Sequence, residues 1–263
     1  MQTDHLLLDV DAKGVATVTF DRPEVHNAFD DQMIAGLSTI FADLRANAGV
    51  RVVVIAGHGK SFSAGADLNY MKRVAGFSQE ENVADALRLG RMLLSLRTLP
   101  MPTVALVHGA AYGGGVGLVA ACDIAVAVEG ATFALTEVKL GLVPAMISPF
   151  VLEAIGARQA RRYFHTAERF NAIDAQRIGL VHQVVADESA LGGCRDRIVG
   201  ELLAAGPEAS IAAKDLVADV AGRRVDDAML QDLAGRIAAR RASSEGLEGL
   251  SAFLERRPPQ WTP

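Results

Sequence analysis

The sequence of 263 residues is poor in cysteine, in aromatic residues and in long apolar runs. Its two cysteines, Cys122 and Cys194, are too few for a disulfide framework and lack metal-ligand spacing, which favours a reducing cytoplasm. Aromatic residues make up 5%, so we expect a core of Ala, Val, Leu and Ile. The longest apolar stretch, 104–128, is interrupted by His108, several glycines and Asp123, so no membrane-spanning segment is predicted.

Dense basic clusters are also absent, and the net charge is −5. Nucleic-acid binding needs a basic face that neutralises phosphates, so we expect no nucleic-acid partner. Arginines occur only in pairs, at 161–162, 223–224, 240–241 and 256–257. We interpret these pairs as solvated helix faces, although one or two could still hold the phosphates of a cofactor. Half of the residues are apolar, which suits a packed α/β domain with a helical appendage.

The hydrophobic pattern predicts an α/β core followed by a helical region. Apolar runs and alternations predict strands at 6–10, 15–20, 51–56, 103–107, 124–128 and 180–185. An N-cap at Asp30, a capping box at Ser78 and Glu81, and helical spacing predict helices at 31–46, 79–99 and 116–121. Beyond about residue 145 nearly every segment has helical spacing, up to about residue 241. The last prolines, at 258–259, are expected to mark a frayed tail.

Two glycine-containing turns, 61–68 and 108–117, each follow a predicted buried strand and lead into a helix. Small residues let a ligand approach the backbone, and the first N–H groups of a helix lack internal partners. Such turns can bind an anion, or an oxygen that becomes an anion during a reaction. From spacing alone, tight packing of helix on strand explains either turn equally well.

Known glycine-rich motifs do not fit these turns. A P-loop ending at Gly59-Lys60-Ser61 would need a glycine at Val54, and a dinucleotide fingerprint would need one at Leu118. The G-x-S-x-G elbow of serine hydrolases is missing. A P-loop, a dinucleotide-binding turn and a serine-hydrolase elbow are therefore disfavoured.

Glu137 is a single carboxylate among apolar residues, in the segment 133–144. Apolar surroundings raise the pKa of a carboxyl group, which makes it useful as an acid or base near neutral pH. The alternative is a surface glutamate on a short amphipathic turn, paired with Lys139.

Four segments, 21–28, 62–68, 109–117 with 121–123, and 137–144, resemble in order and spacing the successive signatures of the enoyl-CoA hydratase/isomerase (crotonase) family. The similarity runs from about residue 5 to 255. It implies an α/β fold in which a spiral of β-β-α units, with the CoA site and active site, fills residues 1–195. Residues 196–263 would form a C-terminal helical trimerisation region. It also implies an acyl-CoA substrate, a homotrimer or a hexamer of two trimers, and no metal or bound cofactor apart from the coenzyme A of the substrate.

The resemblance also implies roles for individual residues. The oxyanion hole of the family falls on the backbone N–H groups of Ala66 and Gly114, and Glu137 matches one of the two glutamates of the hydratases. The residues that match the substrate- and CoA-binding segments are His26, Ala28, Ala64, Ala66, Asp67, Leu68, Tyr112 and Gly114. We expect His26, His108 and His165 to be mainly packing or surface histidines, and Asp67 and Asp123 to be N-cap or turn residues.

Two positions depart from the family pattern. Gly117 stands where two-glutamate hydratases have their other glutamate, and the segment 144–149 replaces a glycine-rich run. The segments 113–117, 136–145 and 161–170 together resemble bacterial methylglutaconyl-CoA hydratases. The leading hypothesis is hydration of a 2-enoyl-CoA, with 3-methylglutaconyl-CoA or a related branched acyl-CoA as the expected substrate. The alternatives are isomerisation of a 3-enoyl-CoA to a 2-enoyl-CoA and a non-catalytic acyl-CoA-binding protein.

Overall fold

Two β-sheets and a set of helices make up the computed structural model, which describes residues 2–3 and 5–262. The larger sheet has the order β1-β2-β3-β4-β5-β7-β10, with the strands Gln2–Thr3, Leu6–Val10, Val15–Phe20, Val52–Gly57, Thr103–Val107, Ile124–Val128 and Gln183–Val185. The smaller sheet has the order β6-β8-β9, with the strands Ala110–Tyr112, Thr132–Ala134 and Phe170–Asn171. The helices are α1 Asp31–Ala46, α2 Leu68–Val74, α3 Gln79–Arg97, α4 Gly114–Ala121, α5 Ser148–Thr166, α6 Ala172–Arg177, α7 Glu188–Ala204, α8 Pro207–Val220, α9 Asp227–Ala242 and α10 Ser244–Glu255, with 3₁₀ turns η1 Pro23–Val25 and η2 Glu137–Leu140.

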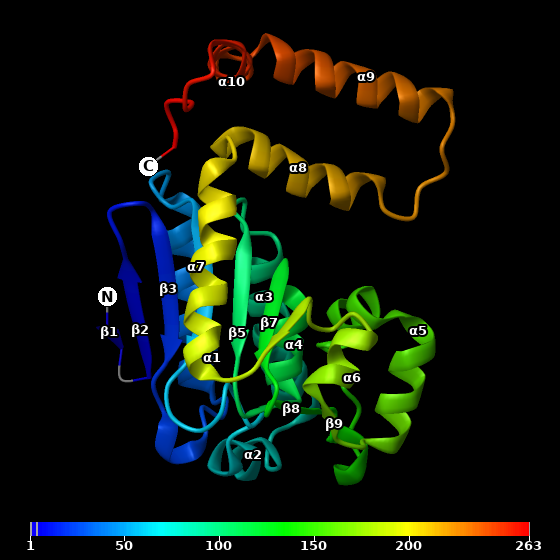
Figure 1. Ribbon diagram of the computed structural model, residues 1–263. Helices are drawn as coiled ribbons and strands as arrows, with labels where there is room; N and C mark the ends of the chain where they lie inside the picture. Colours follow the sequence, from blue (N-terminus) through cyan, green and yellow to red (C-terminus); the bar gives the residue numbers. More distant parts are fainter. Residues whose placement is uncertain (1, 4, 263) are drawn as a thin grey trace.

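In the larger sheet β1 pairs antiparallel with β2, and β2 pairs antiparallel with β3. From β3 onward, β4, β5, β7 and β10 add in parallel. Parallel neighbours need crossovers, and helices supply them. Helix α7 lies across one face of this sheet, while α1, α3 and α4 lie behind it (Figure 1). Both faces are therefore covered, which explains the continuous apolar runs of β4, β5 and β7.

A second layer of short strands explains how the two glycine-containing turns meet. After β5 the chain makes β6 and then α4, and after β7 it makes β8 and then η2. The segment after β4 follows the same route, because Ser63 bridges to Ala111 and Ala66 bridges to Phe29 before α2 begins. This repetition of strand, short strand and helix is the predicted spiral of β-β-α units.

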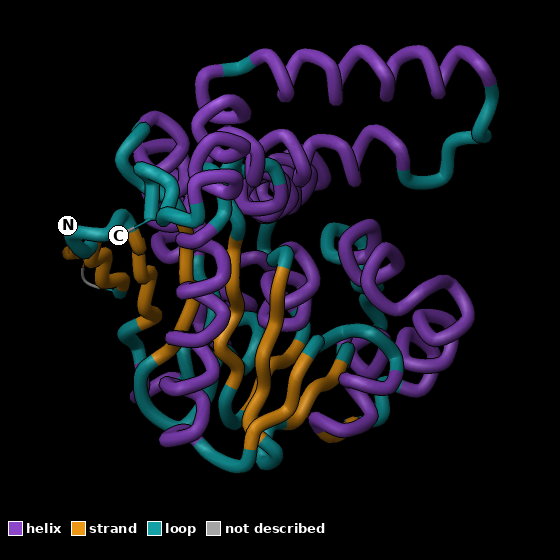
Figure 2. The backbone as a smooth tube through the Cα atoms, turned by 45° about the horizontal axis from the view of Figure 1, so that its top comes forward, coloured by secondary structure: helices purple, strands orange, loops and turns teal. Residues whose placement is uncertain are grey.

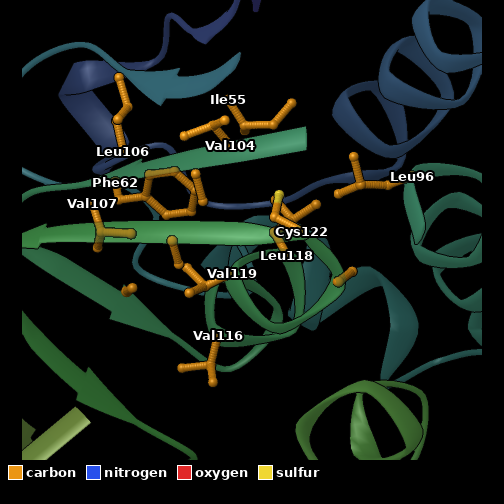
Figure 3. Close-up of a cluster of buried hydrophobic side chains, with 14 of the residues drawn as sticks. Ile55, Phe62, Leu96, Val104, Leu106, Val107, Val116, Leu118, Val119 and Cys122 are labelled. Atoms are coloured by element: carbon orange, nitrogen blue, oxygen red, sulfur yellow. The ribbon is translucent and has the colours of Figure 1, made fainter. Parts of the chain in front are cut away.

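The core lies between the larger sheet and the helices α1, α3 and α4. Helix α1, predicted from its helical spacing, buries one apolar face, which consists of Met33, Ile34, Leu37, Ile40, Phe41 and Leu44. Figure 3 shows the aliphatic packing around β5 and α4, where Cys122 points among leucines and valines. Both cysteines are free and buried, and burial raises the pKa of the Cys122 thiol to about 12. Cys122 is thus an inert core residue.

The C-terminal helices α8, α9 and α10 extend beyond the sheet, and α9 runs alongside α8 as an arm (Figures 1 and 2). Helix α7 spans the predicted division after residue 195. Its residues Leu191, Cys194 and Leu203 are all buried in the core, so the packing of the α/β body continues almost to its end. Among the described residues, no helix combines the length and apolarity needed to cross a bilayer.

Several elements differ from the sequence-based expectation. Helix α4 begins at Gly114, two residues before its predicted start, and α2, α10 and the smaller sheet were not anticipated. The tail is anchored, because Trp261 Nε1 donates to the Ala204 carbonyl at 3.0 Å and Arg51 donates to the Trp261 carbonyl at 3.0 Å. The prediction of a frayed tail was wrong for the residues described, since it considered only the two prolines.

Candidate active site

The two glycine-containing turns lie against each other. Ser63 N–H donates to the Ala110 carbonyl, and Tyr112 N–H donates to the Ser63 carbonyl, both at 2.9 Å. Gly65 has a φ of 93°, and a Cβ there would lie 3.2 Å from the Tyr112 carbonyl oxygen. Glycine is needed at this position both for its backbone conformation and for the close approach of the second turn.

Ala66 presents a free N–H group at this contact. Phe29 N–H donates to the Gly65 carbonyl at 2.7 Å, and Asp67 N–H donates to the Phe29 carbonyl at 2.8 Å. Because backbone groups alternate in direction along an extended strand, the Ala66 N–H points away from Phe29. Within the described part of the chain it has no acceptor.

Gly114 supplies a second free N–H group, as the first residue of α4. Gly113 precedes it with φ 48° and ψ −114°, a conformation that suits only glycine, and donates its own N–H to the Ala134 carbonyl at 2.9 Å. The first N–H groups of a helix have no internal partner and carry the positive end of the helix dipole. The two turns thus bring two unpartnered N–H donors to one place.

Glu137 lies beside these donors, at the start of η2. Its Oε1 is 3.3 Å from the position that a Cβ on Gly113 would take, so any side chain at 113 would press on the carboxylate. Its Oε2 is buried and has no hydrogen-bond partner. Desolvation by burial raises the pKa of Glu137 above its ordinary value, although its own backbone N–H opposes the shift. The burial of this carboxylate argues against the alternative of a surface glutamate paired with Lys139.

The predicted CoA-binding segments lie side by side. Ala64 N–H donates to the His26 carbonyl at 2.9 Å, which joins the segment 26–28 to the segment 64–68. The His26 ring is exposed and its Nδ1 lies 3.1 Å from Ser61 Oγ. Ala28 is buried, whereas Leu68 is 74% exposed and is available to an incoming ligand.

Asp67 and Tyr112 are already engaged within the protein. Asp67 is the predicted N-cap, since its Oδ1 accepts from the N–H groups of Asn69 and Tyr70. Burial opposes its ionisation, but these two N–H groups and Arg22 outweigh burial and lower its pKa. The Tyr112 hydroxyl lies 3.1 Å from Thr132 Oγ1, and the ring carries the Arg169 guanidinium 5.4 Å from its centroid. Their predicted contacts with CoA stay predictions.

Gly117, the site of the missing second glutamate, is filled by another side chain. A Cβ built there would lie 2.4 Å from Ile147 Cγ2 and 3.0 Å from Ile147 Cβ, far inside van der Waals contact. Gly113 and Gly117 lie four residues apart at the start of α4, so they share a helix face. Ile147 therefore occupies the volume into which a second carboxylate at position 117 would project. This volume lies one helical turn along α4 from Gly113, the residue beside which Glu137 lies. The two departures from the family pattern, Gly117 and the segment 144–149, thus contact each other through Ile147.

The remaining polar candidates lie outside this arrangement. His108 is buried and its Nε2 lies 3.0 Å from the Gly59 carbonyl oxygen, while His165 is exposed. Asp123 accepts from Thr103 and from Lys214, at 2.8 and 2.7 Å. It lines a cleft of about 530 Å³ beneath α8, in which acidic and basic side chains pair with one another. Among the described residues no cluster of His, Cys, Asp and Glu could hold a metal ion.

Three residues that shape the site were missed by sequence reasoning. Phe29 contacts the backbone around both donors. Its own backbone hydrogen-bonds to the residues on either side of Ala66, and its ring carbon Cδ2 would lie 3.2 Å from a Cβ on Gly114. Ile147 fills the space at Gly117. Arg22 donates to the Ala28 carbonyl and to Asp67. The basic residue directly before the proline at position 23 was the available signal for Arg22, whereas nothing local distinguishes Phe29 or Ile147.

Comparisons with known proteins agree with this fold. Residues 11–263 match the family model described as Enoyl-CoA hydratase/isomerase. A crystal structure of an enoyl-CoA hydratase from Shewanella pealeana is 41% identical with a TM-score of 0.95, over 99% of this chain and 97% of that chain. Pseudomonas aeruginosa AtuE is 36% identical with a TM-score of 0.94, over 99% and 100%. An enoyl-CoA hydratase from Mycobacterium smegmatis is 35% identical with a TM-score of 0.92, over 98% and 99%.

The spiral of strands and helices with its helical C-terminal region is thus the crotonase fold. The chain belongs to the enoyl-CoA hydratase/isomerase family, and it is an enzyme of the hydro-lyase type that acts on an acyl-CoA substrate.

Proposed function

We propose that this enzyme adds water to a 2-enoyl-CoA thioester, with Glu137 as its single acid and base. The observation that supports the proposal is the position of the Glu137 carboxylate beside Gly113, next to the free N–H groups of Ala66 and Gly114. A thioester carbonyl placed between the two donors would have its oxygen stabilised as it becomes an enolate oxygen.

One carboxylate can carry the proton through both halves of the reaction. As a water oxygen bonds to C3 of the substrate, one water proton passes to Glu137 and the electron pair of the C2–C3 double bond moves onto the thioester oxygen. The enolate then collapses, and Glu137 returns the proton to C2. The elevated pKa of Glu137 suits both steps, because the group must accept and release a proton near neutral pH.

The proposed acyl group is branched or carboxylated, with 3-methylglutaconyl-CoA as the leading candidate. This choice is supported by the sequence segments 113–117, 136–145 and 161–170, which resemble bacterial methylglutaconyl-CoA hydratases. Coenzyme A takes part only as the thioester portion of the substrate, and the proposed reaction requires no other cofactor.

The test is a substrate panel that follows loss of the conjugated enoyl thioester absorbance with crotonyl-CoA and 3-methylglutaconyl-CoA. Glu137→Gln is expected to lower kcat by at least about 100-fold, the lower range for removal of a positioned acid/base. Lys139→Gln, two residues away on η2, is the matched control and should retain activity. Full hydratase activity in Glu137→Gln would refute the proposal.

A second candidate activity is the shift of a double bond from a 3-enoyl-CoA to a 2-enoyl-CoA. It is favoured by Ile147, which leaves the site with one carboxylate, because isomerisation needs only one group that moves a proton between C2 and C4. Incubation with a 3-enoyl-CoA would produce a gain of conjugated absorbance. Hydration with no such gain would reject this candidate.

We also propose that residues 196–263 form the trimerisation region of a cytoplasmic homotrimer, or of a hexamer built from two trimers. The support is a set of exposed apolar side chains on α9 and α10, Leu230, Ile237, Leu247, Leu250, Phe253 and Leu254, each at least half exposed. The free, buried cysteines suit a reducing compartment. Sedimentation equilibrium should give a multiple of three chains, and Phe253→Asp with Leu254→Asp should dissociate it. A monomeric wild type would refute the assembly.

A further inference from the structure

Arg22 lies at the centre of a buried group of charges that the proposed chemistry does not use. Its guanidinium contacts Asp30 Oδ2 at 2.8 Å and Asp67 Oδ2 at 3.2 Å, and it donates to the Ala28 carbonyl at 2.9 Å. The three side chains are only 11, 12 and 8% exposed. One arginine therefore holds two aspartates that are far apart in the sequence.

Each of these aspartates also begins a helix. Asp30 is the N-cap of α1 and accepts from Met33 N–H at 2.8 Å. Asp67 is the N-cap of α2 and accepts from the N–H groups of Asn69 and Tyr70 at 2.8 and 3.1 Å. Because an N-cap side chain is held in place by its own helix, the arginine fixes the start of α1 relative to the start of α2.

The residues next to these aspartates form the bridge that presents Ala66. Phe29 precedes Asp30 and Ala66 precedes Asp67, and these two residues pair in parallel. The Phe29 ring meanwhile packs beneath Gly114. A shift of α1 relative to α2 would thus move both N–H donors of the proposed oxyanion hole.

Stability alone does not account for this group. Replacing a buried ion cluster by apolar residues is often neutral or stabilising, because desolvation offsets the attraction between the charges. Arg22 Nε is in addition buried without a hydrogen-bond partner, which costs free energy. Two carboxylates near a site of developing negative charge are also unfavourable unless a cation compensates them.

We propose that Arg22 is a positioning residue: by bridging the N-caps of α1 and α2, it sets the Phe29–Ala66 bridge and so aims the Ala66 N–H at the thioester oxygen. This role rests on the proposed function, because it requires Ala66 and Gly114 to stabilise an enolate.

The experiment compares two variants that break the bridge with opposite changes of charge. Arg22→Met removes the cation, whereas Asp67→Asn removes an anion and keeps a good N-cap. The probe is acetoacetyl-CoA, whose enolate has its own ultraviolet absorbance and forms more readily when its oxygen is stabilised. Both variants should lower the bound enolate fraction, with kcat for hydration falling about 10- to 100-fold. For Arg22→Met, which changes none of the predicted CoA-binding residues, the affinity for coenzyme A alone should change less than about threefold.

The opposite charge changes of the two variants distinguish a positioning role of Arg22 from a purely electrostatic effect of its charge. If Arg22 acts only through its charge, Asp67→Asn should raise the enolate fraction while Arg22→Met lowers it, and that result would overturn the proposal. Arg22→Lys keeps the charge without the planar fork and should resemble Arg22→Met. Arg177→Gln, which removes the ion pair between Asp174 and the 69% exposed side chain of Arg177, is the control. A wild type that shows no enolate would instead refute the proposed oxyanion hole, and wild-type enolate in both variants would refute only the role of Arg22.

Discussion

The contact between Gly117 and Ile147 allows a quantitative test of why the site has one carboxylate. In Gly117→Ala the new methyl would lie 2.4 Å from Ile147 Cγ2, and Ile147 is 3% exposed and held at the start of α5. Overpacking of a core costs about 1–3 kcal/mol, and the helix preference for alanine returns about 0.5–1 kcal/mol. The net destabilisation should be about 1–2 kcal/mol, or roughly 2–8 °C in Tm for a domain of this size.

Urea denaturation of a double-mutant cycle with Ile147→Ala measures the contact itself. Ile147→Ala alone should cost about 2–4 kcal/mol through the cavity it leaves. In that background Gly117→Ala should be neutral or stabilising, which gives a coupling of about 1–3 kcal/mol. Gly193→Ala in α7 is the matched control, because its new methyl meets nothing within 4 Å, and it should stabilise by about 0.5–1 kcal/mol.

Two results would refute this reasoning: a Gly117→Ala variant as stable as the wild type, or strictly additive effects in the cycle. The functional counterpart is Gly117→Glu, which should fold stably only with Ile147→Ala. In that double variant a second carboxylate beside Glu137 should move the pH dependence of hydration to higher pH, because like charges disfavour ionisation.

Other outcomes follow from single groups. Because the pKa of Glu137 is raised above its ordinary value of 4.5, hydration should be lost on the acid side at a midpoint above that value. The raised pKa also makes the stability of the fold depend on pH. The contribution of Glu137 to stability is fully present below the unfolded-state pKa and is lost as pH rises through the folded-state pKa. Glu137→Gln should therefore raise Tm at pH 8 and leave it unchanged at pH 4. Arg51→Gln, which loses the bonds to the carbonyls of Leu203, Ala205 and Trp261, should lower the free energy of unfolding by about 2 kcal/mol in urea titrations, and an unchanged midpoint would contradict this. Cys122 should react with a thiol reagent only on unfolding, and rapid labelling of the native protein would contradict its burial.

Local signals in the sequence predicted the main elements well. The boundaries of α1 follow from its N-cap and its apolar stripe, and both hydrogen bonds of the capping box that starts α3 are present. The strands β5 and β7 match their predicted ranges, because a short continuous apolar run between turn residues is typical of a buried strand. The crotonase fold itself came from four motifs in register, since no local pattern dictates a spiral.

What the sequence could not predict depends on contacts between distant residues. The strands of the smaller sheet are two or three residues long, and only pairing with remote segments makes them strands. Arg22 and Asp67 meet across 45 positions, and Gly117 gives no sign that Ile147 will fill its free space. Glu137 was recognisable as a candidate from its apolar neighbours, but its position beside Gly113 required the assembled spiral.

The interlock of Gly117 and Ile147 also bears on how such a site can change over generations. A second glutamate at position 117 cannot be gained first, because it would collide with Ile147, and a smaller residue at 147 leaves a cavity until the glutamate arrives. Each single step lowers stability, and only the pair restores packing. Drift between one-carboxylate and two-carboxylate forms of this enzyme therefore has to cross an unstable intermediate, which tends to preserve whichever form a lineage already has.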